Sequence, residues 1–476
     1  MRYRFAKNVV LLEKDGGGFL LARKPLCLLH LNSALTSLLR AVRDDTPRQD
    51  SGNEENILNK ISKMGFLQCC WDEPMDLSQA PSVSVVIPVK DRAEELRRCL
   101  ASLAALRYPR EKIEIIVVDD GSSDTCREIA EDWGAIMLSS GGTGLGPSAA
   151  RNIGAAAATG EILAFIDSDC TASAKWLNEL IAVFGDLRVA AVGGKVEGLH
   201  TASALDRYEA TMSSLSLGAR QRSAREGQDT FYLPSCNLLV RRKVFLTLHG
   251  FDRTMHVGED VDLSYRLRDK GWHLVYLPQG TVHHEHRNRY ASFMARRFDY
   301  GTSEEILQRR HPLRKKRLPL PPWLLAVVAL CLTMPLTGYW GVLSAFTLLA
   351  VDGLVTGRKT RQLGIRLGLP TLLAGRCRAL GSLVYYLCFH LVRYYILVLL
   401  LACCLMPSLM PLGTAVFLCA ALVDYAVKKP KLAFVLFASI YLFEQLSYGL
   451  GVLRGCLARR NFASYRVIMG RQRETC

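Results

Sequence analysis

In the middle of the chain, short apolar runs alternate with stretches that have the spacing of amphipathic helices. The runs at residues 83–89 and 113–118 are rich in β-branched side chains, and each ends in charged or small polar residues. All-apolar strands of this kind are typical of a parallel sheet that is buried on both faces. Because such strands alternate with helices, the pattern predicts an α/β domain over residues 82–310.

The first 72 residues follow a different pattern. Three consecutive glycines at residues 16–18 separate two short apolar runs, which predicts a β-hairpin. Residues 26–40 and 54–64 have helical spacing, so we expect a small module of a hairpin and two helices at residues 1–72, without catalytic residues. A polar linker bracketed by prolines, residues 72–81, connects this module to the α/β domain.

The pattern changes again at Pro319, where long apolar runs begin. The runs are separated by prolines, glycines and basic clusters, and they lie at residues 323–355, 380–406, 412–427 and 432–453. A helix needs about 20 apolar residues to cross a membrane, so we expect three to five membrane segments over residues 319–455 and a basic tail at 456–476. Pro335 interrupts the first run, which predicts either one long tilted span or a hairpin of two short helices.

The net charge supports a membrane location. The chain has 60 Lys and Arg against 44 Asp and Glu, a formal net charge of +16. Much of the excess lies beside the apolar runs, at residues 309–317, 358–378 and beyond 454. This distribution is typical of the cytoplasmic loops of a membrane protein. We therefore expect the cell (inner) membrane, with the α/β domain on the cytoplasmic side, and no nucleic-acid partner; a soluble helical domain is the alternative.

Carboxylates collect where the predicted strands of the α/β domain end. The apolar run at residues 162–166 is followed by Asp167 and Asp169, and Asp91 and Asp120 follow two earlier strands. Ligands of open α/β sheets bind outside the carboxyl ends of the strands, so we expect these acids to lie close together. A D-x-D pair suits a divalent cation that holds a diphosphate, whereas a D-x-D alone is more often a polar turn.

The glycine-rich turn at residues 141–146 excludes two common classes of nucleotide-binding protein. Pro147 follows this turn, so the dinucleotide-binding pattern G-x-G-x-x-G is absent. The chain also has no G-K-[ST] sequence, which a P-loop requires. Neither a Rossmann dehydrogenase nor a P-loop NTPase is therefore expected.

Four motifs of the α/β domain, in this order, resemble those of the family 2 glycosyltransferases, which have the GT-A fold. They are IPVKDR, VVDDGSSD, GPSAARNIG and AFIDSDC. The resemblance covers residues 82–300 and implies a GT-A doubly wound mixed sheet, a nucleotide-sugar donor and a divalent metal ion, Mn2+ or Mg2+. Arg296 and Arg297 lie where processive membrane synthases carry Q-x-x-R-W, but the glutamine and the tryptophan are missing, which weakens the case for a polymer-extruding synthase.

The resemblance also implies roles for residues that bind the donor. Pro88 and Asp91 are expected near the nucleobase, and Asp120 is expected to pair with the edge of the base. Asp167 is expected to reach the ribose or the metal ion. Arg151, in the A-R-N turn, is a candidate contact of the donor, with a purely structural arginine as the alternative.

The resemblance places the metal ion at the D-x-D pair. Asp169 is expected to bind the ion at the diphosphate, and Asp167 is a second candidate ligand. His284 lies in a V-x-H-x-H pattern after a short apolar strand, and it is the expected third ligand, although a single histidine is more often structural. Carboxylates suit hard cations in general, so the choice between Mg2+ and Mn2+ stays open.

The acceptor side is expected in the second half of the domain. Residues 231–252 resemble the acceptor-pocket segment of the family, and the sequence from Gly258 matches its G-E-D-x-D-L motif. An inverting transfer needs a carboxylate that takes the proton of the acceptor hydroxyl. The family assigns this base to the position of Asp260. The alternative is that the acids of this motif only favour the start of a helix.

The N-terminal segment resembles the small winged-helix peptide-binding chaperone of the pyrroloquinoline quinone pathway. That resemblance implies a module for a precursor peptide or a peptide-derived acceptor at residues 1–72. With the family 2 domain and the membrane helices, the chain resembles the glycosyltransferases of mycofactocin-type systems, which decorate a peptide-derived redox cofactor with glucose. The expected reaction is therefore transfer of a hexose, from UDP-glucose, with inversion.

Two other functions stay open at this point. A membrane lipid glycosyltransferase, acting on polyprenyl phosphate or diacylglycerol, would use the same site and the same membrane helices but would not need the N-terminal module. A scaffold with an inactive transferase domain would be expected to have lost Asp169 or Asp260, and both are present.

Overall fold

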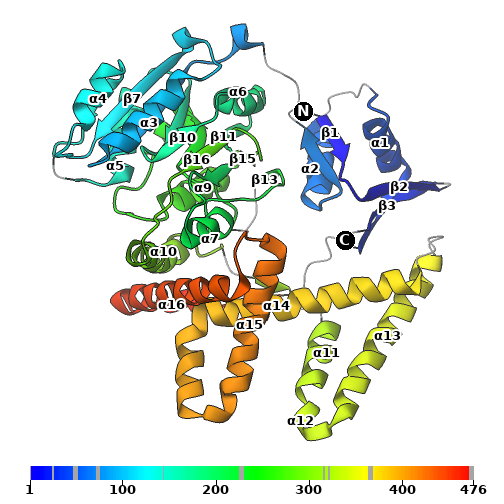
Figure 1. Ribbon diagram of the computed structural model, residues 1–476. Coiled ribbons are helices and arrows are strands. Elements are labelled where there is room, and N and C mark those ends of the chain that lie inside the picture. Colours follow the sequence, from blue (N-terminus) through cyan, green and yellow to red (C-terminus); the bar gives the residue numbers. More distant parts are fainter. Residues whose placement is uncertain are drawn as a thin grey trace. The chain divides into compact units, whose positions relative to one another are not determined.

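The computed structural model describes residues 2–14, 16–23, 26–46, 52–70, 76–142, 144–224, 230–314, 317–319, 322–362 and 368–470 (Figure 1). The chain forms two compact units. The first unit combines Met1–Trp71, Arg317–Cys388 and Val467–Cys476, and the second combines Asp72–Lys316 and Phe389–Arg466. The second unit contains the α/β domain, and it is described first because it carries the candidate site.

The α/β domain is built on one eight-stranded mixed sheet, with the strand order β13-β15-β11-β14-β9-β6-β7-β8. Its strands are β6 (Val83–Val89), β7 (Ile113–Asp119), β8 (Ile136–Ser139), β9 (Ile162–Ile166), β11 (Val189–Gly193), β13 (Arg222–Ala224), β14 (Asn237–Arg241) and β15 (His273–Tyr276). β6 pairs in parallel with β7 and β9, whereas β14 is antiparallel to both β9 and β11. The predicted α/β class with a GT-A mixed sheet is confirmed.

Helices connect these strands and pack closely on the sheet. They are α3 (Ala93–Ala104), α4 (Cys126–Asp132), α5 (Pro147–Ala157), α6 (Trp176–Ile181), α7 (Ala204–Met212), α8 (Arg242–Thr247) and α9 (Glu259–Asp269). In α5, Gly154 faces β6, where a Cβ atom would lie only 2.5 Å from Val86 Cγ1. The small residues of α5 therefore allow this helix to lie directly on the sheet, and its first turn begins at the carboxyl edge of the strands.

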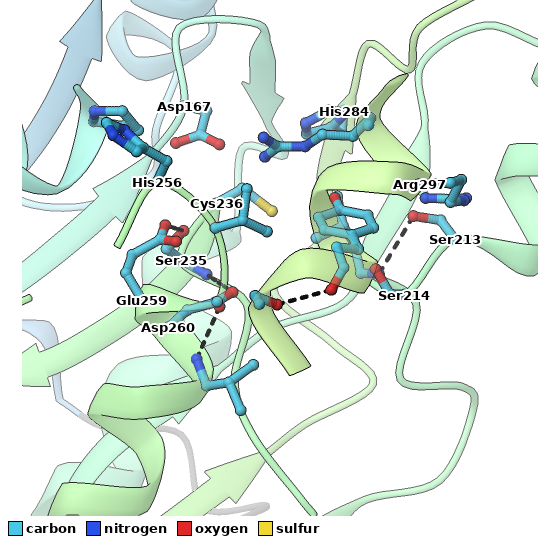
Figure 2. A pocket seen from close by; sticks show the side chains of 18 of the residues that line it. Asp167, Ser213, Ser214, Ser235, Cys236, His256, Glu259, Asp260, His284 and Arg297 are labelled. Atoms are coloured by element: carbon cyan, nitrogen blue, oxygen red, sulfur yellow. Dashed lines mark hydrogen bonds between the residues drawn. The ribbon is translucent and has the colours of Figure 1, made fainter. Parts of the chain in front are cut away.

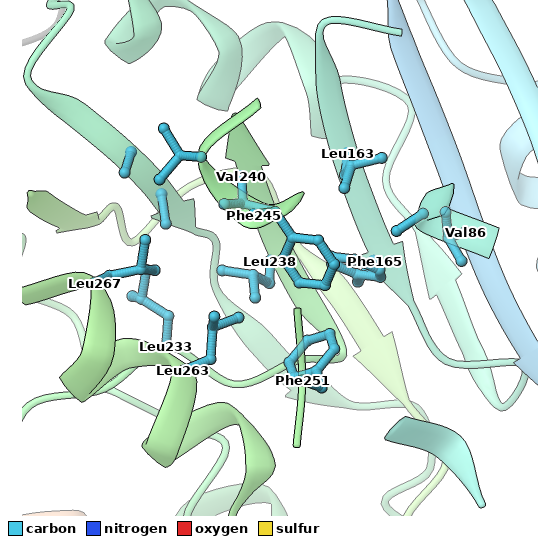
Figure 3. Packing of buried hydrophobic residues seen from close by; sticks show 14 of the residues in the cluster. Val86, Leu163, Phe165, Leu233, Leu238, Val240, Phe245, Phe251, Leu263 and Leu267 are labelled. Atoms are coloured by element: carbon cyan, nitrogen blue, oxygen red, sulfur yellow. The ribbon is translucent and has the colours of Figure 1, made fainter. Parts of the chain in front are cut away.

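A continuous hydrophobic core fixes the sheet against the segment that leads to α9 (Figure 3). The rings of Phe165, Phe245 and Phe251 form a triangle, with centroid distances of 5.2, 5.2 and 5.3 Å. Large buried aromatic side chains contribute strongly to core stability. Phe165 belongs to β9, whereas Phe251 follows α8, so this triangle ties the strand that carries the D-x-D pair to the chain that enters α9.

A second, three-stranded sheet lies at the end of β9. It contains β10 (Cys170–Ala172), β16 (Val282–His284) and β12 (Val196–Gly198), in the order β10-β16-β12. β10 and β16 are antiparallel, with Cys170 directly opposite His284. Asp169 immediately precedes β10, so this pairing brings the D-x-D pair next to His284.

Helix α16 packs directly against the last helix of the α/β domain. Figure 1 shows α10 (Tyr290–Arg310) and α16 (Phe434–Arg459) side by side. A Cβ atom on Gly301 would collide with the carbonyl of Tyr448, and one on Gly451 would collide with the carbonyl of Phe298. Glycines at such crossings let two helix backbones approach closely. α16 is therefore part of the same packed unit as the α/β domain, although the predicted domain boundary after residue 310 separates them.

Substitution Gly451→Ala should destabilise the second unit by about 1–3 kcal/mol, because the added methyl group has no room between two backbones. The measurement is the thermal unfolding midpoint in detergent. Gly381→Ala is the matched control, since Gly381 also lies in an apolar helix but has open space around its Cβ position. If both variants unfold at the same temperature, the close α10–α16 contact is wrong.

The C-terminal region contains six helices among its described residues. They are α11 (Pro322–Leu332), α12 (Met334–Thr337), α13 (Tyr339–Gln362), α14 (Leu369–Leu405), α15 (Met410–Lys428) and α16. The first predicted apolar run is a hairpin: Val327 of α11 packs on Ala345 and Leu349 of α13. A hairpin was one of the two predicted alternatives, but its second helix, α13, has 24 residues and is not short as predicted.

Four of the described helices are long and apolar enough to cross a membrane, within the predicted range of three to five. They are Tyr339–Gln362, Pro370–Leu405, Pro407–Lys428 and Phe434–Arg459. The helix Pro370–Leu405 has 36 residues and is about 54 Å long, longer than the ~30 Å hydrocarbon core. In the last helix, 56% of the apolar window is buried inside the protein, against 11–22% in the other three. The four helices indicate membrane association, and the last one has a second role in packing.

The N-terminal module contains two small sheets and two helices. Its elements are β1 (Arg2–Phe5), β2 (Val9–Lys14), β3 (Gly17–Arg23), β4 (Leu26–Asn32), α1 (Ser33–Arg43), α2 (Gly52–Lys63) and β5 (Leu67–Cys70). β2, β3 and β4 form one sheet, and β1 pairs with β5. The predicted hairpin is present, and the second predicted helix corresponds to α2. The winged-helix assignment stays a prediction.

The first predicted helix of this module was placed too early. Residues 26–32 form β4, and helix α1 begins only at Ser33. Within β4, Cys27 and Leu31 are buried, whereas His30 is exposed. The Asn32 side chain accepts a hydrogen bond from Leu35 N at 2.9 Å and caps the helix. A short apolar run such as residues 26–32 fits both a strand and a helix. Here the pairing with β3 makes these residues a strand, and the Asn32 cap places the start of the helix after them.

Candidate active site

The carboxyl ends of three neighbouring strands form one side of a cavity of about 830 Å3 in the second unit. β7, β6 and β9 lie next to each other in the sheet, so Asp120, Lys90 and Asp167, which follow them, lie along one edge. All three line the cavity. Figure 2 shows Asp167 in the same pocket as Asp260 of α9. The chain thus brings residues from both halves of the α/β domain to one cavity.

Asp120, the predicted partner of the nucleobase, holds the glycine-rich turn in place. Its Oδ1 accepts hydrogen bonds from Ser140 Oγ at 2.6 Å and Leu145 N at 2.8 Å, and its Oδ2 accepts one from Gly146 N at 2.7 Å. Asp120 therefore fixes the turn that leads into α5. The contact of Asp120 with a nucleobase stays a prediction. Such a contact would use the lone pairs of the carboxylate that these hydrogen bonds leave over.

Of the other two residues predicted near the base, Pro88 lines the cavity, whereas Asp91 is not among the lining residues. Asp91 Oδ1 accepts hydrogen bonds from Ser123 N at 2.7 Å and Ser123 Oγ at 3.0 Å. These hydrogen bonds hold the pKa of Asp91 below its usual value. In this structure Asp91 ties the loop after β6 to the loop after β7, and its predicted role at the base stays untested.

Arg151 of α5 links two acids at the centre of the site. It is only 3% exposed. Its Nη2 lies 2.5 Å from Asp167 Oδ1, and its Nη1 lies 2.9 Å from Glu259 Oε1. Burial alone would raise the pKa of Asp167, but the Arg151 guanidinium more than offsets it and holds that pKa below the usual value. Arg151 thus joins β9 to the first turn of α9 and keeps Asp167 ionised.

Asp169 and His284 face each other as the pairing of β10 with β16 predicts. His284 Nε2 lies 3.6 Å from Asp169 Oδ1. The other carboxylate oxygen, Oδ2, is contacted by the guanidinium of Arg92. Asp169, Cys170 and His284 bring one potential ligand atom each to within 4.8 Å of one another. Asp167, the other predicted ligand, is instead engaged by Arg151, so its role as a ligand stays a prediction.

The donor set fits a hard divalent cation. One carboxylate and one imidazole are ligands that Mn2+ accepts, with substrate oxygens completing its shell. His284 Nδ1 is buried without a hydrogen-bond partner among the described residues, so Nε2 is the nitrogen directed at Asp169. Burial and the neighbouring Cys236 raise the pKa of the Cys170 thiol, the third residue of this group.

Asp260, the predicted base, lies in the first turn of α9. It accepts hydrogen bonds from Val261 N at 2.8 Å and Ser235 N at 3.3 Å. Burial, and then the neighbouring carboxylate of Glu259, raise the pKa of Asp260 to about 7. A carboxylate with this pKa can accept a proton near neutral pH, which is the property expected of a general base.

The C-terminal helices also contribute to the cavity, which the sequence did not predict. Arg393 and Tyr394 of α14 and Tyr448 of α16 line it. The link runs through buried ion pairs: Arg297 of α10 contacts Glu209 of α7, and its Nε lies 3.2 Å from Glu444 Oε1 of α16. Figure 2 shows Arg297 at the end of the pocket away from Asp167. These pairs join residues far apart in sequence, and no local motif marks them.

Besides Arg151, three further arginines line the cavity near the D-x-D pair. Arg92 contacts Asp169, and Arg287 and Arg296 are the other two. Burial, and then the nearby charges of Arg296 and Arg92, lower the pKa of Arg287. Arg92, Arg287 and Arg296 thus bring three positive charges to the same cavity. Arg92 and Arg287 were not singled out from the sequence, although Arg92 is part of the first motif.

The mixed eight-stranded sheet and its helices have the architecture of a GT-A domain. Residues 84–248 match the family described as Glycosyl transferase family 2. The resemblance found in the sequence is thereby confirmed.

The domain is similar to the pre-mycofactocin glycosyltransferase of Mycobacterium tuberculosis, with 41% identity over 235 residues, 48% of this chain and 48% of that protein. The match thus spans about half the length of each. Glycosyltransferase AglE of Haloferax volcanii is 32% identical over 208 residues, 42% of this chain and 65% of that protein. Among solved structures, the mannosyltransferase PcManGT from Pyrobaculum calidifontis, in complex with GDP-Man and Mn2+, has a TM-score of 0.48 and 17% identity, over 85% of this chain and 95% of that one.

Proposed function

We propose that this protein is an inverting, metal-dependent hexosyltransferase (EC 2.4). In this proposal it moves glucose from UDP-glucose to a hydroxyl group of a peptide-derived redox cofactor of the mycofactocin type. One observation carries the proposal: a single cavity combines Asp169 and His284, which suit a divalent cation, with Asp260, whose pKa of about 7 suits a general base. The similarity to the pre-mycofactocin glycosyltransferase supports the choice of acceptor.

The chemistry follows from the positions of the acids. The carboxylate of Asp260 takes the proton of the acceptor hydroxyl as the acceptor oxygen bonds to the anomeric carbon of the sugar. The bond from that carbon to the diphosphate oxygen breaks, and the diphosphate leaves with the electron pair. When bound at Asp169 and His284, a divalent ion would neutralise the charge that develops on the diphosphate. One displacement of this kind inverts the anomeric centre.

Asp260 also favours a hydroxyl acceptor over a phosphate acceptor. A polyprenyl phosphate already carries ionised oxygens at neutral pH, so it needs no base. A hydroxyl does need one, and Asp260 has the pKa for that task. The alternative of a membrane lipid glycosyltransferase is supported by a different observation, since Tyr394 of α14 and Tyr448 of α16 line the cavity. Among lipids, a diacylglycerol would meet the same requirement for a hydroxyl.

We assign the remaining parts of the chain as follows. Residues 1–72 hold the precursor peptide or the peptide-derived acceptor, and residues 82–310 catalyse the transfer. Residues 319–455 attach the enzyme to the cell membrane, with the catalytic domain in the cytoplasm and residues 456–476 as a basic tail. The four apolar helices and the basic clusters beside them support this placement.

The first test is hydrolysis of a panel of nucleotide sugars by the purified protein with Mn2+. We expect UDP-glucose to be hydrolysed, and Asp169→Ala to raise the Mn2+ concentration needed by about 100-fold or more, because even the loss of a second-shell partner costs about 10–100-fold in metal affinity. Asp132→Ala is the matched control, since Asp132 ends α4, is exposed and is not among the residues that line the cavity. If no nucleotide sugar is hydrolysed or bound, the donor assignment is wrong.

The acceptor is tested separately by deleting residues 1–72. This deletion should abolish transfer to the peptide-derived acceptor and leave hydrolysis of the donor intact. An unchanged transfer rate would contradict the proposed role of the N-terminal module and favour the lipid acceptor.

A further inference from the structure

The two carboxylates of the D-x-D pair have arginine partners of different kinds. Asp167 is held by Arg151, whose side chain is only 4% exposed and which also binds Glu259. Asp169 is held by Arg92, whose side chain is 37% exposed. A buried, doubly paired arginine is costly to move, whereas a partly exposed ion pair contributes little and is readily exchanged. Of the two ion pairs, the one between Arg92 and Asp169 is therefore the more easily exchanged, because its arginine is the more exposed.

Arg92 covers only one side of Asp169. Its Nη1 contacts Oδ2, whereas His284 Nε2 lies 3.6 Å from Oδ1. Arg92 is the N-cap residue of α3 and lines the cavity. If Arg92 swings away, the carboxylate and the imidazole remain facing each other.

Arg92 also has a second place to go. Arg92, Arg287 and Arg296 all line the same cavity, and the charges of Arg296 and Arg92 contribute to the lowered pKa of Arg287. Three guanidinium groups that line one cavity favour an anion there. The diphosphate of the proposed donor is such an anion, and guanidinium groups bind phosphate oxygens by charge-assisted hydrogen bonds. Arg92 can therefore exchange one anionic partner, Asp169, for another.

We propose that Arg92 is a substitute cation for the metal site. It neutralises Asp169 while the site is empty, and it moves to the diphosphate when a divalent ion takes its place at Asp169. This inference rests on the proposed function. A divalent ion that binds alone must therefore compete with Arg92 for Asp169. An ion that binds together with the diphosphate does not, because Arg92 then binds the diphosphate. Metal and nucleotide should then bind with positive cooperativity, and by linkage each should raise the affinity for the other by the same factor.

The test is isothermal titration of the full-length protein with Mn2+ alone, with UDP alone, and with UDP at saturating Mn2+. In Arg92→Gln, free Mn2+ should bind about two- to fivefold tighter, because its competitor is gone. In the same variant, UDP with Mn2+ should bind about tenfold more weakly, because a charge-assisted hydrogen bond to the diphosphate is lost. The two effects have opposite signs, which a loss of folded protein cannot produce.

Two further variants complete the experiment. Arg92→Lys keeps the charge and should stay near the wild type in its affinity for free Mn2+. Arg97→Gln is the matched control, since Arg97 lies on the same helix, is 52% exposed and pairs with Glu94 at 3.5 Å. It should leave both affinities unchanged.

The outcomes separate this inference from the proposed function. If the wild type binds both Mn2+ and UDP but Arg92→Gln binds free Mn2+ no tighter, the role of Arg92 is overturned and the glycosyltransferase proposal survives. If the wild type binds neither ligand, the proposed function fails and this inference fails with it.

Discussion

Replacing Asp260 by Asn should lower the rate of glycosyl transfer by about 10²–10⁴-fold, the usual contribution of a general base. The amide has nearly the shape of the carboxylate and can keep the contacts with Val261 N and Ser235 N, but it cannot accept the proton of the acceptor hydroxyl. Donor binding should change little, because Asp260 belongs to α9, whereas the expected metal and diphosphate contacts come from the D-x-D pair that follows β9. The measurement is kcat for transfer together with the Kd for UDP.

The pH dependence of the wild type gives an independent check on the same residue. The pKa of Asp260 is about 7, and only its ionised form can act as a base. Transfer should therefore fall about tenfold for each pH unit below 7 and level off above it. In Asp260→Asn the residual rate should lose this dependence.

Asp132→Asn serves as the control, because it removes an exposed carboxylate from the end of α4 and should change neither the rate nor the pH profile. A wild-type rate that stays constant across the neutral range would show that Asp260 is not the base. An Asp260→Asn variant that transfers the sugar at the wild-type rate would show the same.

The sequence predicted the α/β domain well because its signals are local. All-apolar strands ending in acids, such as β7 and β9, are read directly from the residues, and parallel strands place their carboxyl ends along one edge. The same rule is enough to place Asp120 and Asp167 together from the sequence alone. Asp169 of the D-x-D pair also lies next to His284, through the register of β10 with β16, and their roles as ligands stay a prediction.

What the sequence could not predict depends on pairing between distant parts of the chain. Residues 26–32 have a pattern that suits a helix as well as a strand, and only pairing with β3 makes them β4. The contacts of Arg297 with Glu209 and Glu444 join three helices, and no motif contains all of them. For that reason the sequence indicated only a membrane segment at α16, whereas this helix also forms part of the site's surroundings.

Arg92 is a motif residue whose contact could not be predicted from the sequence. It belongs to the IPVKDR motif, yet the motif gave it no role because its partner, Asp169, follows a different strand. Asp91, the residue before it, was expected near the base, but it binds Ser123 and is not among the residues that line the cavity. Within one loop, backbone direction decides which of two neighbouring charged side chains enters the cavity, and that direction is not readable from residue type.

Removing the buried arginine of the site should have the largest effect on stability. Arg151→Met should lower the free energy of unfolding by about 3–5 kcal/mol at neutral pH, the cost of breaking a buried ion pair by removing one partner. The side chain of Arg151 is 4% exposed, and those of its partners, Asp167 and Glu259, are 26% and 9% exposed. Methionine fills much of the volume but removes the guanidinium that pairs with both carboxylates. The measurement is denaturant unfolding in detergent, compared with Arg151→Lys, which keeps the charge.

The pH dependence of this loss identifies its cause. In the wild type the pKa of Asp167 is held below its usual value, so the stabilisation by Arg151 is present above the pKa of the unfolded chain and is lost as pH falls through the lower folded pKa. In Arg151→Met the carboxylates can avoid the penalty by binding protons. The difference between the two proteins should therefore shrink at acidic pH. Adding Glu259→Gln to Arg151→Met should restore part of the stability, because one uncompensated charge is removed. If the loss is the same at acidic and neutral pH, it reflects packing around Phe251, over whose ring the guanidinium lies at 5.5 Å, and not charge.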